Sequence, residues 1–145
     1  MVPSGLDDLY RDKVILDHCR NPRNFERLDD PDFCGDAVNP FCGDEIHLQL
    51  SFGCEGKVDE VGFQGEGCAI NIAAGSLMSN AVLGLDRPQI LDLKRYFTSV
   101  MNDDIDVEFE GSRAIGELSA LLSVKEFPVR IKCVLLSWST INESI

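Results

Sequence analysis

Hydrophobic and polar positions alternate strictly over residues 45–52, where every second side chain is apolar: Ile46, Leu48, Leu50 and Phe52. Alternation of this kind is typical of a strand that buries one face in an antiparallel sheet. Residues 53–56 contain two glycines and predict a turn, after which residues 58–64 predict a returning strand. Two strands alone are marginally stable, so we expect a third strand before or after this hairpin.

Apolar residues at a spacing near 3.6 predict helices around the hairpin. The predicted helices cover residues 6–20, 68–83, 88–101, 113–124 and 129–141. Gly84 suits the end of the second helix, Ser112 the cap of the fourth, and Pro128 the first turn of the last. Residues 21–38 and 102–110 are polar and irregular, and we interpret both stretches as surface loops.

Length and composition limit the class of protein. The 145 residues predict one domain, residues 1–145, and an apolar content of 44% is typical of a globular protein. There is no run of about eighteen apolar residues that would predict a transmembrane helix. Residues 1–11 lack the basic region and apolar core of a secretory signal, so we expect a cytoplasmic protein.

The chain is strongly acidic, with 13 basic and 25 acidic residues and a net charge of −12. This charge disfavours binding to nucleic acids and anionic membranes, and it favours a partner with a basic docking surface. Solubility alone explains the charge equally well.

The six cysteines are Cys19, Cys34, Cys42, Cys54, Cys68 and Cys133. In a reducing compartment, cysteines more often bind metals or react than form disulfides. The sequence contains no Cys-x-x-Cys pair, so a metal site has to be assembled from distant segments. Cys19, near the end of a predicted helix, is interpreted as a small buried hydrophobe.

Residues 39–44, Asn-Pro-Phe-Cys-Gly-Asp, put a thiol and a carboxylate two residues apart just before the alternating strand. Gly43 allows a sharp turn that aims Cys42 and Asp44 at one point, an arrangement that suits a metal ion. An exposed turn with a stray cysteine is the alternative. Residues 33–36 repeat the motif inside the predicted loop, where no strand follows directly, so we do not assign Cys34 as a ligand.

The hairpin geometry separates the remaining cysteines. Eight extended residues carry the chain roughly 26 Å, so Cys54 lies at the far end of the hairpin. The returning strand brings Cys68 back beside Cys42 and Asp44. Cys68 opens a predicted helix, whose N–H groups stabilise a thiolate, although a buried structural cysteine is the alternative.

Cys133 lies in the last predicted helix, one turn after Arg130 and next to Lys132. Nearby cations lower the pKa of a thiol and favour the thiolate as a ligand or nucleophile. The candidate ligand set is therefore Cys42, Asp44, Cys68 and Cys133. Three sulfurs and one oxygen fit tetrahedral zinc or an iron–sulfur cluster, and the hard oxygen would make bound iron exchangeable.

Several spaced motifs resemble those of the NifU/IscU-type iron–sulfur assembly proteins. The motifs are Asn21-Pro22-Arg23-Asn24-Phe25, Asn39-Pro40-Phe41-Cys42-Gly43-Asp44, Gly65-Glu66-Gly67-Cys68-Ala69-Ile70, Arg130-Ile131-Lys132-Cys133 and Trp138. Lys132, where the IscU branch carries a histidine, and the long segment before Cys133 resemble the SufU branch, whose members bind zinc and take persulfide sulfur from a cysteine desulfurase. Asn71-Ile72 departs from the Ser-Gln common among relatives, and we expect the difference to affect packing or docking.

The resemblance implies an α+β fold, a small antiparallel sheet with helices packed on one face, in agreement with the hydrophobic patterns. It also implies Zn²⁺, or a transient 2Fe–2S or 4Fe–4S cluster, bound by the four candidate ligands. A cysteine desulfurase and downstream iron–sulfur assembly proteins are the implied partners of a sulfur acceptor or scaffold, rather than a stand-alone enzyme. We assign Cys42 as the sulfur acceptor because a loop residue can leave the metal with least disturbance. Cys133 is the second candidate, with Arg130 as electrostatic support.

Other functional classes compete with this interpretation. A structural zinc domain that binds partners would use the same ligands in a closed, inert site. A cysteine-nucleophile hydrolase needs a general base, and no motif ties His18 or His47 to a reactive cysteine. A zinc deaminase is excluded because the required glutamate is missing after His47 and no Pro-Cys-x-x-Cys follows. The sequence leaves open whether the native occupant is zinc or a cluster.

Overall fold

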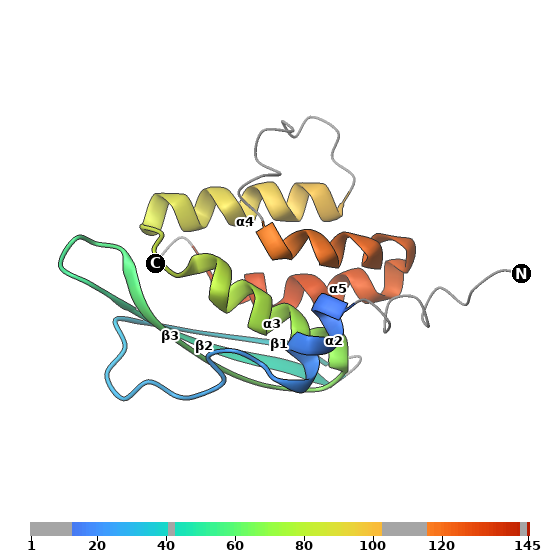
Figure 1. Ribbon diagram of the computed structural model, residues 1–145, viewed down its shortest axis with the longest axis horizontal. Helices are drawn as coiled ribbons and strands as arrows, with labels where there is room; N and C mark the ends of the chain where they lie inside the picture. The colour runs from blue at the N-terminus through green and yellow to red at the C-terminus, as the bar shows by residue number, and fades with distance from the viewer. Residues whose placement is uncertain (1–12, 41–42, 103–115, 143–144) are drawn as a thin grey trace, which may run out of the picture.

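Strand β2, Asp44–Phe52, is the middle strand of a three-stranded antiparallel sheet with the order β1-β2-β3. In the computed structural model (Figure 1), which describes residues 13–40, 43–102, 116–142 and 145, β3 spans Val58–Glu66 and returns along β2. The two strands are paired from Glu45↔Glu66 to Phe52↔Val58. The predicted hairpin is therefore confirmed, and its apolar face lies in the core.

The third strand is β1, Phe33–Asn39, which pairs with β2 from Phe33↔Leu50 to Asn39↔Asp44. A third strand was expected, but the interpretation of residues 33–38 as loop is wrong. Glycine and aspartate weaken the local strand signal, and β1 forms because β2 offers it a long-range ladder. Gly35 lets β1 pass under the C-terminal segment, since a Cβ there would lie 2.0 Å from the carbonyl oxygen of Thr140.

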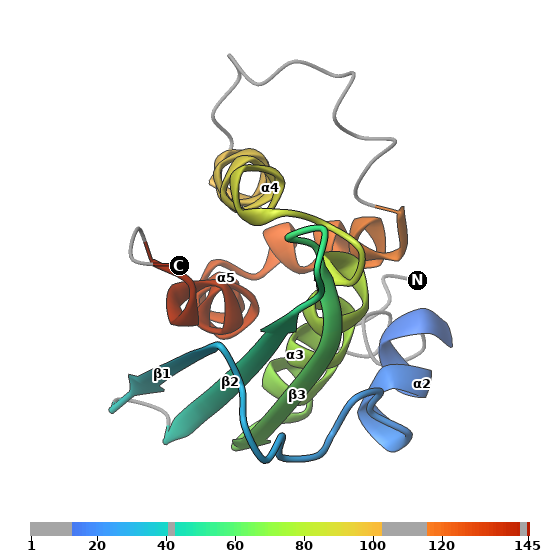
Figure 2. The same cartoon turned by 90° about the vertical axis from the view of Figure 1, so that its left-hand side faces the viewer.

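The helices lie on one face of the sheet, as Figures 1 and 2 show. In chain order they are α2 (Lys13–Arg20), α3 (Ala69–Val82), α4 (Arg87–Met101), the 3₁₀ helix η2 (Gly116–Glu126), α5 (Pro128–Leu136) and the 3₁₀ turn η3 (Ser137–Thr140). Helix α3 packs directly on the sheet, and most of its side chains are buried. This arrangement confirms the predicted α+β fold.

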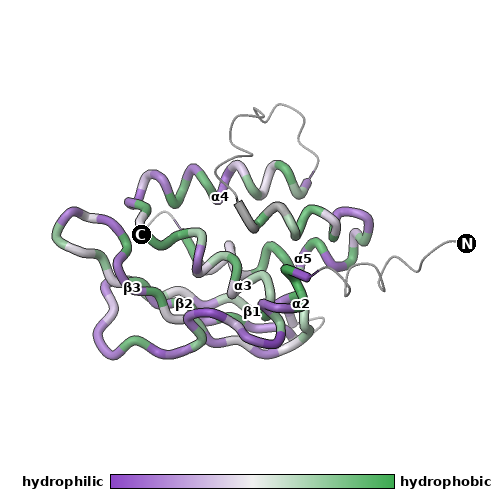
Figure 3. Tube along the Cα trace, in the orientation of Figure 1, coloured by the Kyte–Doolittle hydropathy of each residue, from purple (hydrophilic) through white to green (hydrophobic). Residues whose placement is uncertain are grey.

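Helix α4 forms the outer layer of the molecule (Figure 1). Its turns alternate between apolar and polar positions (Figure 3), as expected for a helix with one solvent face. Phe97 on its buried face packs against Trp138, with ring centroids 5.7 Å apart. Among the described helices, none combines the length and apolar character needed to cross a bilayer.

The segment between α2 and β1 crosses the other face of the sheet at β3. The carbonyl oxygen of Asn24 accepts a hydrogen bond from the N–H of Phe63 at 2.9 Å. Gly62 leaves room for this crossing, since a Cβ there would lie 2.5 Å from the carbonyl oxygen of Glu26. The predicted loop is thus correct up to the start of β1.

The fourth predicted α-helix is a 3₁₀ helix in the structure. Residues 116–126 form a 3₁₀ helix where the sequence predicted an α-helix over 113–124. Leu118, Leu121 and Val124 are buried at a spacing of three residues. One turn of a 3₁₀ helix contains three residues, so this helix type places all three side chains on the core side. Ser112 and residues 113–115 lie outside the described residues, as do residues 6–12 of the first predicted helix.

The last helix was predicted to run to residue 141, but α5 ends at Leu136 and the chain tightens into η3. Two side-chain hydroxyl groups form local hydrogen bonds where the α-helix changes to the 3₁₀ turn. Ser137 Oγ donates to the carbonyl of Val134 and Thr140 Oγ1 to that of Ser137, each three residues back. Such local bonds favour a 3₁₀ turn over a continued α-helix.

Candidate metal site

Asp44, the first residue of β2, is a fully buried carboxylate at the end of the sheet. Its Oδ1 accepts a hydrogen bond from the backbone N–H of Cys68 at 2.8 Å, which ties the start of β2 to the start of α3. A buried carboxylate is costly unless it is paired or bound to a metal. Its placement in the interior therefore indicates a role beyond solubility.

Gly67 makes the approach of Asp44 possible. Its φ angle is +122°, a conformation that side chains rarely adopt, and a Cβ there would lie 1.9 Å from Asp44 Oδ1. Gly67, directly before Cys68, therefore leaves the space that the buried carboxylate occupies between β3 and α3.

Cys68 is the N-cap residue of α3, in agreement with its predicted position at a helix start. Its thiol does not cap the helix. Instead, Cys68 Sγ lies 3.6 Å from Asp44 Oδ2, so the thiol points toward the carboxylate and makes no hydrogen bond to the first N–H groups of the helix.

Cys133, on α5, is 3% exposed and completes a cluster with Asp44 and Cys68. The ligand atoms of these three residues all lie within 4.8 Å of one another, and we call them the three-donor cluster. No other such group of three or more potential ligands occurs among the residues that the structure describes. The elements that supply it are a strand, a helix N-terminus and a second helix.

The pKa of the Cys133 thiol is raised above its usual range. Burial is the main cause, followed by the Asp44 carboxylate and then Cys68. The sequence predicted that Arg130 and Lys132 lower this pKa, but burial next to Asp44 raises it instead. Two thiols and a carboxylate packed this closely match the donors that zinc prefers, and a bound cation would stabilise their charged forms.

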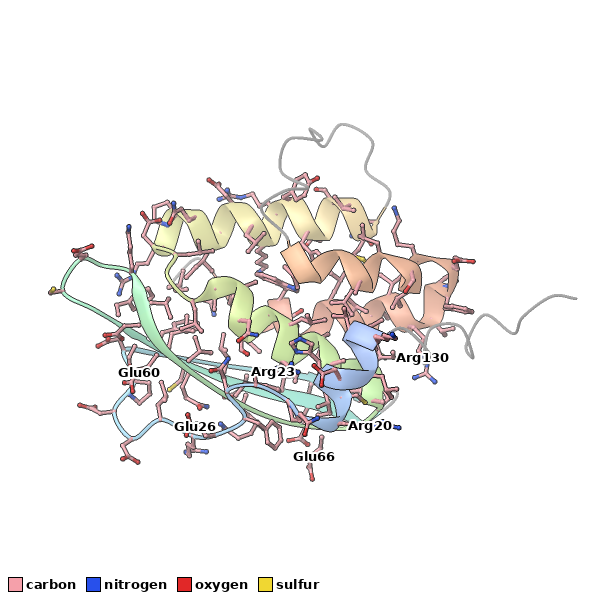
Figure 4. The ribbon with its side chains drawn as sticks, viewed as in Figure 1. Arg20, Arg23, Glu26, Glu60, Glu66 and Arg130 are labelled. Carbon is pink, nitrogen blue, oxygen red and sulfur yellow. The ribbon has the colours of Figure 1, made fainter. Side chains whose placement is uncertain are left out.

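The remaining predicted residues are distributed as follows. Cys42 lies outside the described residues, between Asn39 and the exposed Gly43, whose φ of +74° is consistent with the predicted turn. Cys34 on β1 and Cys54 in the β2–β3 turn are exposed thiols away from the cluster, as Cys54 was predicted to be. Arg130 is half-buried and lies at the same end of the molecule as Arg20 (Figure 4).

Cys19 is half-buried on α2, and its Sγ donates a hydrogen bond to the carbonyl of Ala69 at 3.6 Å. Burial raises the pKa of this thiol, and the nearby Cys68 thiol adds to the increase. Cys19 was predicted to be a small buried hydrophobe; it packs against the core but is only half-buried, and the sequence did not indicate its proximity to Cys68.

Sequence reasoning missed the position of Asn71. This side chain is fully buried in the first turn of α3 and donates hydrogen bonds to the carbonyls of Glu45 and Glu66. The available signal was an amide inside an otherwise apolar helix segment, which was interpreted only as a difference in packing or docking.

A family model described as the NifU-like N terminal domain matches residues 9–141 of the chain. The chain belongs to this family. The zinc-dependent sulfurtransferase SufU of Bacillus subtilis is 38% identical over 142 residues, which cover 98% of this chain and 92% of the relative. The iron–sulfur cluster assembly scaffold protein IscU of Streptococcus pyogenes is 34% identical, covering 100% of this chain and 87% of the relative.

Solved structures agree with the family assignment. A putative iron–sulfur cluster assembly scaffold protein for the SUF system from Fervidobacterium islandicum superposes with a TM-score of 0.77 at 27% identity, covering 92% of this chain and 93% of that one. The N-terminal part of a NifU-like protein from Brucella abortus gives a TM-score of 0.79 at 20% identity, covering 94% and 92%, which supports the fold alone.

Proposed function

We propose that this chain is an iron–sulfur cluster assembly protein that accepts persulfide sulfur from a cysteine desulfurase at a zinc site. The proposed ligands are Cys42, Asp44, Cys68 and Cys133. The main support is the three-donor cluster, of which Asp44 and Cys133 are buried, in a chain that is 38% identical to a zinc-dependent sulfurtransferase over nearly its whole length.

The donor set fits zinc in number and type. Two thiols and one carboxylate come from the three-donor cluster, and Cys42 precedes Asp44 by two residues, so its thiol is within reach as a fourth ligand. When bound, zinc would keep the ligand thiols deprotonated at neutral pH.

In the proposed reaction, sulfur is transferred by thiol–persulfide exchange at Cys42. The Cys42 thiolate attacks the outer sulfur of the desulfurase persulfide. A new S–S bond forms on Cys42, the S–S bond of the desulfurase breaks, and its cysteine leaves as a thiolate. The exchange is balanced and requires no oxidant.

Cys42 is favoured over Cys133 as the acceptor. Cys133 is buried in α5, and Cys68 is tied to Asp44 through its backbone N–H, so moving either thiol would disturb a helix. Cys42 belongs to the β1–β2 connection next to the exposed Gly43. Arg130, one turn before Cys133, would supply positive charge for the anionic persulfide.

The sulfur would pass onward to downstream iron–sulfur assembly proteins. A scaffold role for a transient cluster is a second candidate, supported by the 34% identity to an IscU scaffold protein. In that case the iron–sulfur cluster is cargo, and Asp44 contributes a hard oxygen among soft sulfurs, which makes bound iron easier to release.

The metal site is tested by zinc analysis of purified variants. We expect about one zinc per chain in the parent, as in other four-ligand sites, and strong loss of zinc in Cys68→Ala and Cys133→Ala. Cys54→Ala is the matched control and should keep its zinc, because Cys54 is an exposed thiol in the β2–β3 turn. Full zinc retention in Cys68→Ala would remove the basis for the ligand assignment.

The acceptor is tested by incubating the chain with a cysteine desulfurase and cysteine, followed by peptide mass spectrometry of the added sulfur. We expect the sulfur on Cys42 and a large loss in Cys42→Ser, whereas Cys34→Ser should behave as the parent. Sulfur mainly on Cys133 would reassign the acceptor. A chain that holds zinc but acquires no sulfur would instead be a structural zinc domain.

A further inference from the structure

Asn71 is a polar residue in an apolar setting. Its side chain is fully buried on α3, and its neighbours Ile70, Ala73 and Ala74 are buried as well. The amide nitrogen donates two hydrogen bonds, one to the carbonyl oxygen of Glu66 at 2.9 Å and one to that of Glu45 at 3.2 Å. Both N–H groups of one nitrogen are therefore used.

The two accepting carbonyls lie beside the proposed metal ligands. Glu45 directly follows Asp44, and Glu66 precedes Cys68 by two residues. Glu45 and Glu66 are also register partners at the end of the β2–β3 ladder. Asn71 thus connects the points where the Asp44 and Cys68 segments meet the sheet, and it does so from the helix that Cys68 begins.

Only the donor end of the amide is used. Asn71 Oδ1 has no hydrogen-bond partner among the described residues, although it is buried. A buried oxygen without a partner is unfavourable, so general satisfaction of polar groups does not explain an amide here. The double donation to two strand ends does explain it, because an apolar side chain offers no N–H group and serine offers only one donor.

We propose that Asn71 is a positioning residue for the metal site, holding the Asp44 carboxylate and the Cys68 backbone together before metal binds; this rests on the proposed function. The measurable link is the hydrogen bond from the Cys68 N–H to Asp44 Oδ1. Without the Asn71 bridge, the two segments separate and the ligand atoms leave coordination distance. Groups that orient ligands in this way affect metal affinity about 10- to 100-fold.

The first test is cobalt binding to the full chain, because Co²⁺ replaces Zn²⁺ in tetrahedral sites and its absorption bands report ligand geometry. We expect Asn71→Leu, similar in volume but without donors, to bind cobalt about 10- to 100-fold more weakly and with shifted bands. Ser79→Ala is the matched control. Ser79 is also buried on α3 with polar contacts, but these reach Ser76 and the 23–24 loop.

Ser79→Ala should lower the midpoint of urea unfolding while cobalt affinity and spectrum stay as in the parent. Should Asn71→Leu fail to fold, Asn71→Ser, with its single donor, is measured by the same criteria. A folded Asn71 variant with the cobalt affinity and spectrum of the parent would overturn the proposal.

The second test needs no metal. In the metal-free chain, amide hydrogen exchange of Cys68, followed by NMR, should be about tenfold faster in the Asn71 variant, because its acceptor has moved. Exchange in Ser79→Ala should match the parent. Unchanged Cys68 exchange in the Asn71 variant would also overturn the proposal. A parent chain that binds neither cobalt nor zinc would overturn the proposed function, whereas the exchange rates would still decide the role of Asn71.

Discussion

At the scale of single residues, the candidate metal site depends on how closely backbone and side chains approach. Asp44 is buried against Gly67, and no other residue type leaves space for its carboxylate. A similar closeness appears on the outer face of the sheet, where His47 lies between two carboxylates. Each of these two features can be tested with a single substitution.

We predict that Gly67→Ala abolishes tight zinc binding, because its Cβ would lie 1.9 Å from Asp44 Oδ1 and displace the carboxylate. Gly84→Ala is the matched control. Gly84 also has a positive φ, +84°, so both variants lose about 1–3 kcal/mol to backbone strain, but nothing lies within 4 Å of the position that the Cβ would take at Gly84. Zinc titration separates them, and equal zinc affinity in the two variants would contradict the prediction.

A second residue-scale prediction concerns pH. His47 Nδ1 lies 2.6 Å from Asp36 Oδ1 and Nε2 lies 3.0 Å from Glu45 Oε1. These carboxylates, Asp36 first, raise the pKa of His47 above its ordinary value of 6.5. A raised pKa in the folded state stabilises the fold below the unfolded pKa, and this contribution is lost as pH rises through the folded pKa.

His47→Gln should therefore cost more stability at low pH than at high pH. Because the imidazole is 37% exposed, the difference should be about 0.5 kcal/mol or less. Urea unfolding of parent and variant at about pH 5.5 and about pH 8.5, either side of the ordinary histidine pKa, measures it. A variant that loses the same free energy at both pH values would show that the two contacts do not favour the imidazolium.

At the scale of elements, α4 begins with a reciprocal capping box. Asp86 accepts a hydrogen bond from the N–H of Gln89 at 2.9 Å, and the Gln89 side chain accepts one from the N–H of Asp86 at 2.9 Å. Pro88 follows at a first-turn position. This signal is local, which explains why the sequence placed the start of the helix within one residue.

We predict that Asp86→Ala lowers the free energy of unfolding by about 1 kcal/mol, the usual cost of losing an N-cap. Zinc content should be unchanged, because Asp86 pairs with Lys57 at the turn end of the β2–β3 hairpin, opposite the end where Asp44 lies. Asp92→Ala on the same helix is the control. Asp92 pairs with Arg95 at the surface and should contribute only a few tenths of a kcal/mol, about the value of an exposed helix pair. Equal unfolding free energies for the two variants would argue against the cap.

At the scale of the whole molecule, charge is unbalanced. Thirteen basic residues face twenty-five acidic ones, for a net charge of −12. Some acidic groups are paired, as in the ion pairs Arg23–Asp17 and Arg95–Asp92, but a net charge of −12 leaves an excess of like charges that repel one another.

We therefore predict that sodium chloride stabilises the chain. Raising the concentration from about 10 mM to about 150 mM shortens the screening length from roughly 30 Å to about 8 Å and weakens the repulsion. The free energy of unfolding should rise by on the order of 1 kcal/mol. Thermal unfolding at matched pH measures the change, and a decrease with salt would mean that the attractive pairs outweigh the repulsion.

The amino-acid sequence by itself determined the β2–β3 hairpin, helices α3 and α4 and the start of α5. Each of these has a local cause: period-two alternation, helical spacing, a capping residue or a proline in a first turn. The proximity of Asp44 and Cys68 also follows from local geometry, because a hairpin returns the chain to its starting level.

Tertiary structure decided the rest. Strand β1 exists because β2 provides its hydrogen-bond partners, although its own residues favour a loop. The 3₁₀ form of η2 follows from burial at every third position, and the raised pKa of Cys133 follows from its burial beside Asp44. The double hydrogen bond of Asn71 likewise joins strand ends that are brought together by folding. The pairing of β1 and the burial of Cys133 beside Asp44 involve residues far apart in the chain, and the Asn71 bonds require α3 to pack on the end of the hairpin, so local sequence patterns contain none of these contacts.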